Sequence, residues 1–123
     1  MATLKKILIA EDEKSMAHAL EMKLNKSGFD AKAVFDGEEA ILELKAHKYD
    51  LLLLDLMMPK KNGFDVLLEM KQNNIKVPTI LSTNLCQEDD LKKGKELGAV
   101  DYFVKSDTPI YEVVERIKKI LPI

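Results

Sequence analysis

The chain has 123 residues, of which 46% are apolar and 33% charged, and its formal net charge is −2 at pH 7. This composition is typical of one globular domain, here residues 1–123. It excludes an intrinsically disordered chain and gives no general electrostatic attraction to nucleic acid or membrane. The single cysteine, Cys86, excludes an internal disulfide and fits a reducing compartment. No apolar stretch approaches the roughly 18 residues of a membrane span, and no secretory signal is recognisable, so we expect a cytoplasmic protein.

Five short apolar runs predict β-strands. In chain order they cover residues 6–10, 29–35, 51–55, 78–82 and 101–105. The third and fifth runs are apolar without alternation, which is typical of strands buried on both faces of a sheet. The second run contains Asp30 and Lys32, and this mixed character favours a strand at the edge of the sheet.

Five longer segments follow these runs and predict α-helices. They cover residues 14–26, 37–47, 63–73, 86–97 and 109–121. Asp36 and Glu39 have the spacing of a capping box at the start of the second helix. Thr108 and Pro109 predict the N-cap and the first residue of the last helix. The fourth helix has a weak apolar stripe, so we expect it to pack least tightly.

Strands and helices alternate along the whole chain, and this alternation predicts an α/β fold with a doubly wound parallel sheet. Crossovers between parallel strands are right-handed. With five strands, the flavodoxin-like order 2-1-3-4-5 is the natural candidate. Periodicity alone leaves a Rossmann-type order open.

Polar side chains follow four of the predicted strands. Glu11 and Asp12 follow the first strand, Asp55 ends the third, Thr83 follows the fourth, and Lys105 ends the fifth. The carboxyl ends of parallel strands meet at one edge of the sheet, which is where open α/β folds bind ligands. Three carboxylates, a hydroxyl and an ammonium at that edge predict a site for a divalent cation and a phosphoryl group.

The chain resembles the receiver domain of two-component response regulators over nearly its whole length. The motifs that carry the resemblance are Ile7-Leu8-Ile9-Ala10-Glu11-Asp12-Glu13, Asp50-Leu51-Leu52-Leu53-Leu54-Asp55-Leu56-Met57-Met58-Pro59, Asn62-Gly63, Pro78-Thr79-Ile80-Leu81-Ser82-Thr83 and Gly98-Ala99-Val100-Asp101-Tyr102-Phe103-Val104-Lys105. Each motif is weak alone, but their order and spacing together are highly specific. The resemblance also implies the flavodoxin-like fold.

The resemblance implies a magnesium site. Asp12 and Asp55 would be direct Mg²⁺ ligands, Glu11 would act through water, and the backbone carbonyl of Met57 would complete the protein ligands. This donor set agrees with the oxygen ligands that Mg²⁺ prefers. The same resemblance makes the side chains of Met57 and Leu85 the ones that govern attack by water on the phosphorylated protein. Both are apolar and cannot orient a water, so we expect a long-lived phosphorylated state.

The resemblance implies phosphoryl transfer to Asp55 from the histidine of a sensor histidine kinase or a histidine phosphotransfer protein. Thr83 and Lys105 would contact the phosphoryl oxygens, and positioning with charge stabilisation is most of what such transfer requires. Thr83 and Tyr102 would then form the conformational switch, although a tyrosine in a strand also packs for structural reasons alone. The protein would be a phosphoacceptor that modifies itself, not a turnover enzyme.

An output surface is expected on the face built from residues 86–97, the strand 101–105 and the last helix. Asp101, Glu112 and Arg116 resemble the charges that pair across symmetric dimers of receivers with winged-helix outputs. An activated homodimer or a downstream protein target would use this surface, with no direct contact to nucleic acid. The alternative is an ordinary solvated helix face, where an exposed ion pair contributes only ~0–1 kcal/mol.

Two departures from the family pattern keep other functions open. Receivers usually have a cis proline after the lysine, and here Ser106 stands in its place; a non-proline cis bond costs about 2.5–4 kcal/mol. Asn84 replaces a small residue and could cap the fourth helix with Gln87. These changes are the only support for a pseudo-receiver that takes no phosphate. A hydrolase with an aspartyl-phosphate intermediate ranks last, because Met57 occupies the position of its general acid.

Overall fold

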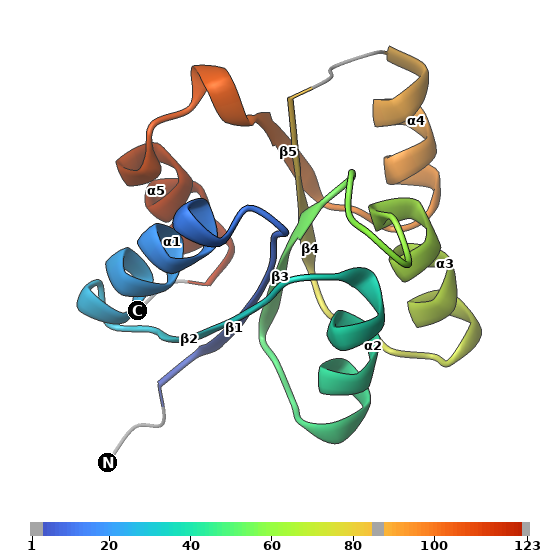
Figure 1. Cartoon of the computed structure of the whole chain (residues 1–123), viewed down its shortest axis with the longest axis horizontal. Helices are drawn as coiled ribbons and strands as arrows, with labels where there is room; N and C mark the ends of the chain where they lie inside the picture. Colours follow the sequence, from blue (N-terminus) through green and yellow to red (C-terminus); the bar gives the residue numbers. More distant parts are fainter. Residues whose placement is uncertain (1–3, 85–87, 122–123) are drawn as a thin grey trace.

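The computed structural model describes residues 4–84 and 88–121. Within these residues, five parallel strands form one sheet in the order β2-β1-β3-β4-β5, which confirms the predicted fold class and strand order (Figure 1). The strands are β1 (Lys6–Ala10), β2 (Asp30–Val34), β3 (Leu51–Asp55), β4 (Thr79–Thr83) and β5 (Asp101–Val104). The helices are α1 (Lys14–Lys26), α2 (Gly37–Ala46), α3 (Gly63–Gln72), α4 (Glu88–Glu96), the short 3₁₀-helix η1 (Lys105–Asp107) and α5 (Ile110–Ile120).

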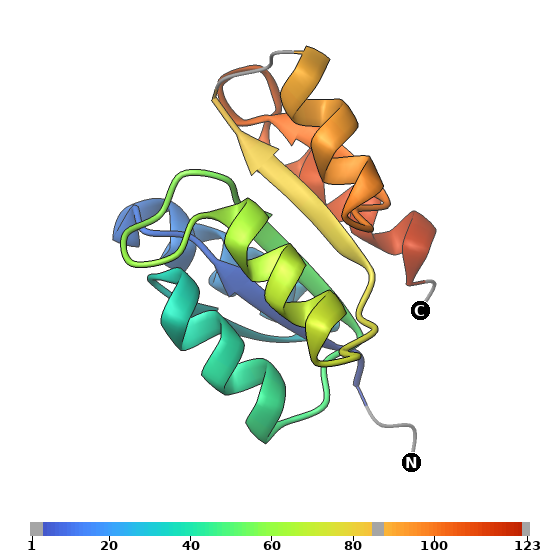
Figure 2. The ribbon, with the colours of Figure 1, turned by 90° about the vertical axis from the view of Figure 1, so that its right-hand side faces the viewer.

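Helices cover both faces of the sheet. Helices α1 and α5 lie on one face, and α2, α3 and α4 lie on the other (Figures 1 and 2). Alternate residues of the central strands supply the two halves of the core: Ile7, Leu51 and Leu53 pack with α1 and α5, while Leu8 and Leu52 pack with α2 and α3. Burial on both faces explains why the third apolar run has no polar alternation. The same prediction is wrong for the fifth run, because β5 is an edge strand and is only partly buried.

Helix α4 buries the fewest residues of the α-helices within the described part of the chain. Gly94 is its buried residue among those that the structure describes, which agrees with the weak apolar stripe in the sequence. The first two residues of the predicted helix, Cys86 and Gln87, lie outside the described residues, as does Leu85. None of the helices in the described ranges is both long and apolar enough to cross a membrane.

Several predicted boundaries are wrong by one residue, and two of them concern the site and the start of the last helix. Lys105 does not end β5 but begins η1. Pro109 is the N-cap of α5 and not its first helical residue, and Thr108 lies before the cap. The reason is that Pro109 is extended (φ −64°, ψ 155°), while its carbonyl oxygen already accepts hydrogen bonds from Glu112 and Val113 at 3.0 and 3.2 Å.

Candidate functional site

The register of the sheet brings the predicted site residues to one edge. Asp55 lies opposite Ser82 on β4, and Thr83 lies opposite Val104 on β5. The backbone N–H of Glu11 donates to Val34 at 3.0 Å, so the hydrogen bonding of β1 with β2 extends to this residue. The strand ends therefore converge as the sequence predicts, and the side chains extend from a rigid parallel sheet.

Lys105 pairs with two acids in this site. Its Nζ lies 2.5 Å from Oε1 of Glu11 and 2.9 Å from Oδ2 of Asp55. The side chains of both acids are almost fully buried, and that of Lys105 is 10% exposed. One ammonium between two carboxylates leaves a net negative charge in a site largely shielded from water, which favours binding of a further cation.

Burial dominates the protonation of Asp55. Removal of the carboxylate from water raises the pKa of Asp55 to about 7; the hydrogen bond from Lys105 opposes this rise, and the nearby Glu11 adds to it. Burial alone would lower the pKa of Lys105, but its hydrogen bonds to Glu11 and Asp55 outweigh this effect and raise it. Lys105 is therefore a fixed positive charge, whereas Asp55 titrates near neutral pH.

Glu11, Asp12 and Asp55 form an acidic group that fits a divalent cation. Each offers a carboxylate oxygen, and these oxygens lie within 4.8 Å of one another. Glu11 and Asp55 are buried and Asp12 is exposed, so the group is open to solvent on one side. Hard oxygen donors with access for water are the ligands that Mg²⁺ requires. The backbone N–H of Met57 donates to Oδ1 of Asp55 at 3.1 Å, which places Met57 next to the group.

Thr83 and Tyr102 have different environments. Thr83 is buried at the end of β4, whereas Tyr102 on β5 is 40% exposed. Tyr102 lines a pocket of about 200 Å³ together with Leu81, Leu91 and Lys95. This pocket lies between β5 and α4, and the switch role of Tyr102 stays a prediction.

The predicted interface charges pair within the chain. Nη1 of Arg116 lies 3.3 Å from Oδ2 of Asp101 and donates to the carbonyl oxygen of Tyr102 at 3.0 Å. Nε of Arg116 lies 3.8 Å from Oε2 of Glu112, one helical turn earlier. The three charges are thus adjacent on β5 and α5, and their use by a partner stays a prediction.

The peptide bond between Lys105 and Ser106 is trans, as are all peptide bonds of the described residues. Lys105 and Ser106 instead enter the 3₁₀-helix η1. Lys105 still reaches both Glu11 and Asp55. The departure from the usual proline therefore leaves the contacts of the lysine in place.

Sequence reasoning missed the role of Gly63. Its N–H donates to the carbonyl oxygen of Leu56 at 2.9 Å, and a Cβ atom on it would lie 2.8 Å from the carbonyl oxygen of Asp55. Gly63 thus lets α3 begin against the backbone of the predicted phosphoacceptor. The sequence signal was available, because Asn62 and Asp65 have capping-box spacing and both of the box's hydrogen bonds are present.

Comparisons with known proteins agree with this geometry. The family model of the response regulator receiver domain matches residues 7–118. The chain is 40% identical over 117 residues to the alkaline phosphatase synthesis transcriptional regulatory protein PhoP of Bacillus subtilis, covering 95% of this chain and 48% of that protein. It is 43% identical over 116 residues to the transcriptional regulatory protein CpxR of Klebsiella pneumoniae, covering 94% and 49%. The chain thus spans about half the length of these curated relatives.

Solved structures show the same fold. The receiver domain of the Francisella response regulator 1452 is 30% identical, with a TM-score of 0.88 over 94% of this chain and 95% of that one. The phosphorylated cyanobacterial phytochrome response regulator RcpA is 28% identical, with a TM-score of 0.82 over 95% of this chain and 93% of that one.

Proposed function

Because this chain belongs to the response regulator receiver domain family, we propose that it is a phosphorylation-dependent switch whose phosphoacceptor is Asp55. The observation that carries the assignment is the position of Asp55. Its carboxylate lies in the acidic group with Glu11 and Asp12, and its Oδ2 lies 2.9 Å from Nζ of Lys105. A cation held by the acidic group and the ammonium of Lys105 would together neutralise the anionic phosphoryl group that the aspartate accepts.

In the proposed reaction, one oxygen of Asp55 attacks phosphorus on a phosphohistidine. The new O–P bond forms as the N–P bond breaks, and the imidazole nitrogen leaves with the bonding electron pair. Mg²⁺, held by Asp12, Asp55, the Met57 carbonyl and Glu11 through water, would neutralise charge between carboxylate and phosphoryl group. Lys105 provides a fixed positive charge and moves from Asp55 to a phosphoryl oxygen. The hydroxyl of Thr83 donates a hydrogen bond to a second phosphoryl oxygen.

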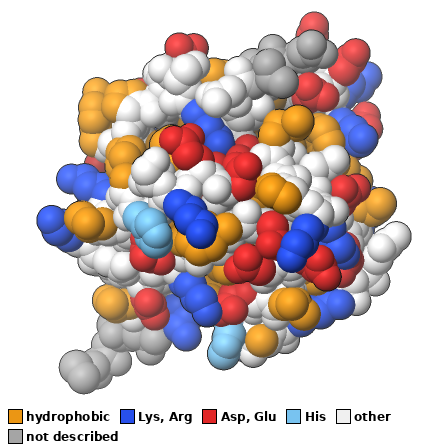
Figure 3. Space-filling view, in the orientation of Figure 1, with side chains coloured by type: hydrophobic (Ala, Val, Ile, Leu, Met, Phe, Trp, Pro, Cys, Tyr) orange, Lys and Arg blue, Asp and Glu red, His pale blue; other side chains and the backbone are white. Residues whose placement is uncertain are grey.

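The partners follow from the family and stay part of the proposal. A sensor histidine kinase or a histidine phosphotransfer protein would supply the phosphoryl group, and the chain would accept it once per cycle and not act as a turnover enzyme. Acidic and basic side chains are interspersed on the described face in Figure 3. With a net charge of −2, this surface favours a protein target for the receiver over direct contact with nucleic acid. The proposed place of action is the cytoplasm.

The assignment is tested by phosphorylation with a small donor. Incubation with acetyl phosphate and Mg²⁺ should add one phosphoryl group by intact mass, and Asp55→Asn should abolish the addition. Asp30→Asn is a matched control, because Asp30 is exposed at the start of β2, and it should be phosphorylated like wild type. A persistent adduct in Asp55→Asn would place the phosphate elsewhere. No adduct in wild type would favour the pseudo-receiver, which binds partners without phosphate.

A further inference from the structure

The loop from β3 to α3 leaves the site and enters solvent. It covers residues 56–62, and Met57 on it is 64% exposed. Its base is fixed by three hydrogen bonds: Leu56 donates to Ser82 at 3.1 Å, Gly63 donates to Leu56 at 2.9 Å, and the N–H of Met57 donates to Oδ1 of Asp55 at 3.1 Å. The carbonyl of Met57 begins the part of the loop beyond these bonds, and its direction depends on how that part is held. The outer end of the loop therefore needs support of its own.

Helix α2 provides this support through Asp36. Oδ1 of Asp36 caps α2 by accepting the N–H of Glu39 at 2.8 Å, and Oδ2 lies 3.6 Å from Nζ of Lys60 on the loop. The hydrogen bond from Glu39 is the main reason why the pKa of Asp36 lies below its usual value, although burial opposes it. One carboxylate thus joins the start of α2 to the loop.

Gly37 brings the two backbones into contact. A Cβ atom at Gly37 would overlap with the carbonyl oxygen of Lys61 and lie 2.8 Å from its carbonyl carbon. These are backbone atoms, so no side-chain rotation could make room. Lys60 reaches this contact in a left-handed conformation (φ 67°), and the N–H of Lys61 donates to Pro59 at 2.7 Å. The turn at Lys60 thus places the Lys61 backbone in close contact with the first turn of α2.

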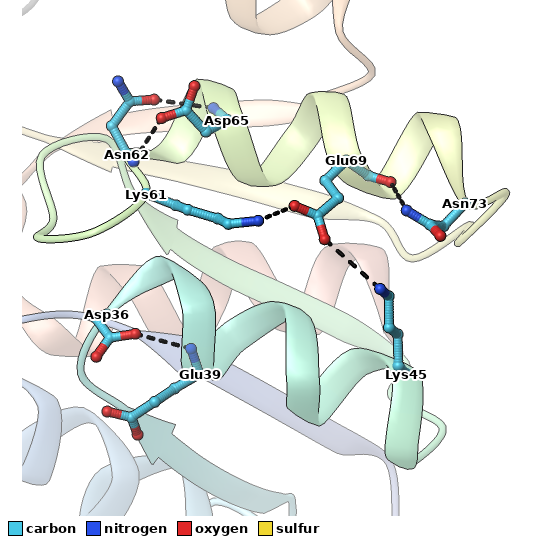
Figure 4. Close-up of polar contacts among 8 residues, drawn as sticks. All are labelled: Asp36, Glu39, Lys45, Lys61, Asn62, Asp65, Glu69 and Asn73. Carbon is cyan, nitrogen blue, oxygen red and sulfur yellow. Dashed lines mark hydrogen bonds and ion pairs between the residues drawn. The ribbon is translucent and has the colours of Figure 1, made fainter.

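The Lys61 side chain fastens the same turn to α3. It pairs with Glu69, which also lies 3.7 Å from Nζ of Lys45 on α2 (Figure 4). The hydrogen bond from Lys61 is the main reason why the pKa of Glu69 is lowered. The loop, α2 and α3 are therefore linked through the carboxylate of Glu69.

We propose that Gly37 is a positioning residue for magnesium: the first turn of α2 supports the β3–α3 loop through the Gly37–Lys61 contact and thereby holds the Met57 carbonyl toward the acidic group. This inference rests on the proposed function, because it assumes that Mg²⁺ binds Asp12 and Asp55. Neither Gly37 nor Lys61 touches the acidic group. Their effect on the metal passes through the loop backbone, as outer groups that orient a ligand often act.

The test measures Mg²⁺ affinity by isothermal titration calorimetry at pH 8, where Asp55 is ionised. Gly37→Ala should weaken Mg²⁺ binding by about tenfold, the lower end of what loss of an orienting group costs. Gly94→Ala is the matched control, because a Cβ atom there would also overlap with a neighbour, in this case Leu81 Cδ1 in the core. It should lower the melting temperature and leave the Mg²⁺ dissociation constant unchanged.

A second variant keeps the inference testable if Gly37→Ala does not fold. Lys61→Met keeps an unbranched side chain but removes its pairing with Glu69, and it should weaken Mg²⁺ binding severalfold. An unchanged dissociation constant in the folded variants, or equal weakening in Gly94→Ala, would overturn the positioning role. The proposed function is judged separately, from wild type and Asp12→Ala. A wild type that binds no Mg²⁺ would overturn both.

Discussion

At the scale of single residues, Asp55 should make stability depend on pH. Burial raises its pKa to about 7, above the ~3.9 of an unfolded aspartate. Its contribution to stability is therefore fully present below about pH 4 and is lost as pH rises through 7. Asn cannot ionise, so Asp55→Asn should be more stable than metal-free wild type at pH 8, on the order of 1–3 kcal/mol. The two proteins should converge toward pH 4.

This prediction is checked by urea denaturation in EDTA at several pH values. Asp30→Asn controls for the loss of an exposed aspartate and should show no such trend. If Asp55→Asn is the less stable protein at pH 8, the ion pair with Lys105 outweighs burial of the carboxylate, and the raised pKa is wrong.

Asp12 should carry most of the stabilisation by magnesium. Three acids in one group repel one another without a cation, and a ligand that binds only the native state stabilises it by mass action. Saturating Mg²⁺ should therefore raise the melting temperature of wild type. Asp12→Ala should lose most of this shift, whereas Glu13→Ala, which changes the next exposed acid, should keep it. A wild type that does not respond to Mg²⁺ would contradict the metal site.

Met57 should set the lifetime of the phosphorylated state. Its side chain is 64% exposed next to Asp55, where an apolar group cannot orient an attacking water. Leu85, the other residue assigned to this role by resemblance, lies outside the described residues. Met57→Asn should speed the loss of phosphate, measured by intact mass over time after removal of the donor. Met22→Asn, with a similarly exposed methionine on α1, should not. A slower or equal loss in Met57→Asn would contradict the role.

At the scale of secondary-structure elements, side chains of α1 close the outer edge of β2. The side-chain amide of Asn25 accepts the N–H of Ala31 at 2.8 Å and donates to its carbonyl oxygen at 3.4 Å. Glu21 accepts the N–H of Ala33 at 2.8 Å. An open strand edge pairs readily with other chains. These contacts therefore cover backbone groups of Ala31 and Ala33 that would otherwise be open at this edge.

Asn25→Ala should open this edge. Two hydrogen bonds are lost, so the free energy of unfolding should fall by about 1–2 kcal/mol, partly offset by the better helix propensity of alanine. Urea denaturation measures this loss, and light scattering at high concentration should detect new self-association. Lys26→Ala, an exposed change in the same helical turn, should do neither. Unchanged stability in Asn25→Ala would mean that water replaces the side chain without cost.

The sequence predicted elements well where the signal is periodic. Continuous apolar runs and helical stripes follow from burial, so β1 and β3 were predicted with their exact bounds. The start of the last helix was misplaced by one residue, because proline suits both the N-cap and the first helical position. Only the extended ψ of Pro109 in the structure shows that it is the N-cap. The contact of Gly37 with Lys61 was not predictable, since it depends on how two loops approach in space. Among the site residues, convergence followed from parallel strands, but the pairing of Lys105 with Glu11 did not.

At the scale of the whole molecule, the site and the predicted output surface are connected through β5. Lys105 follows the C-terminal end of this strand and contacts Asp55, while Asp101 at its other end pairs with Arg116. Exposed Tyr102 lies between them. Withdrawal of Lys105 toward a phosphoryl group would act on the same strand that holds the Arg116 pair. A change in the site can therefore reach the surface through one short element.

Activation should accordingly change the oligomeric state. In this structure Arg116 and Asp101 form an ion pair, with Nη1 of Arg116 3.3 Å from Oδ2 of Asp101. Both side chains are 35% exposed. An exposed pair of this kind contributes only ~0–1 kcal/mol, so little is lost if the charges exchange partners. A two-fold contact would use each exchanged pair twice. Beryllofluoride with Mg²⁺, which imitates the phosphorylated aspartate, should shift the protein from monomer to dimer in sedimentation.

Arg116→Glu should block this shift, because it places like charges opposite Asp101 in both halves of a two-fold contact. Lys119→Glu reverses an exposed charge one turn later on α5 and serves as the control that should still dimerise. The double variant Asp101→Arg with Arg116→Glu restores opposite charges and should recover part of the dimer, as coupled residues do in a mutant cycle. A wild type that stays monomeric with beryllofluoride at high concentration would instead assign Asp101, Glu112 and Arg116 to a different protein partner.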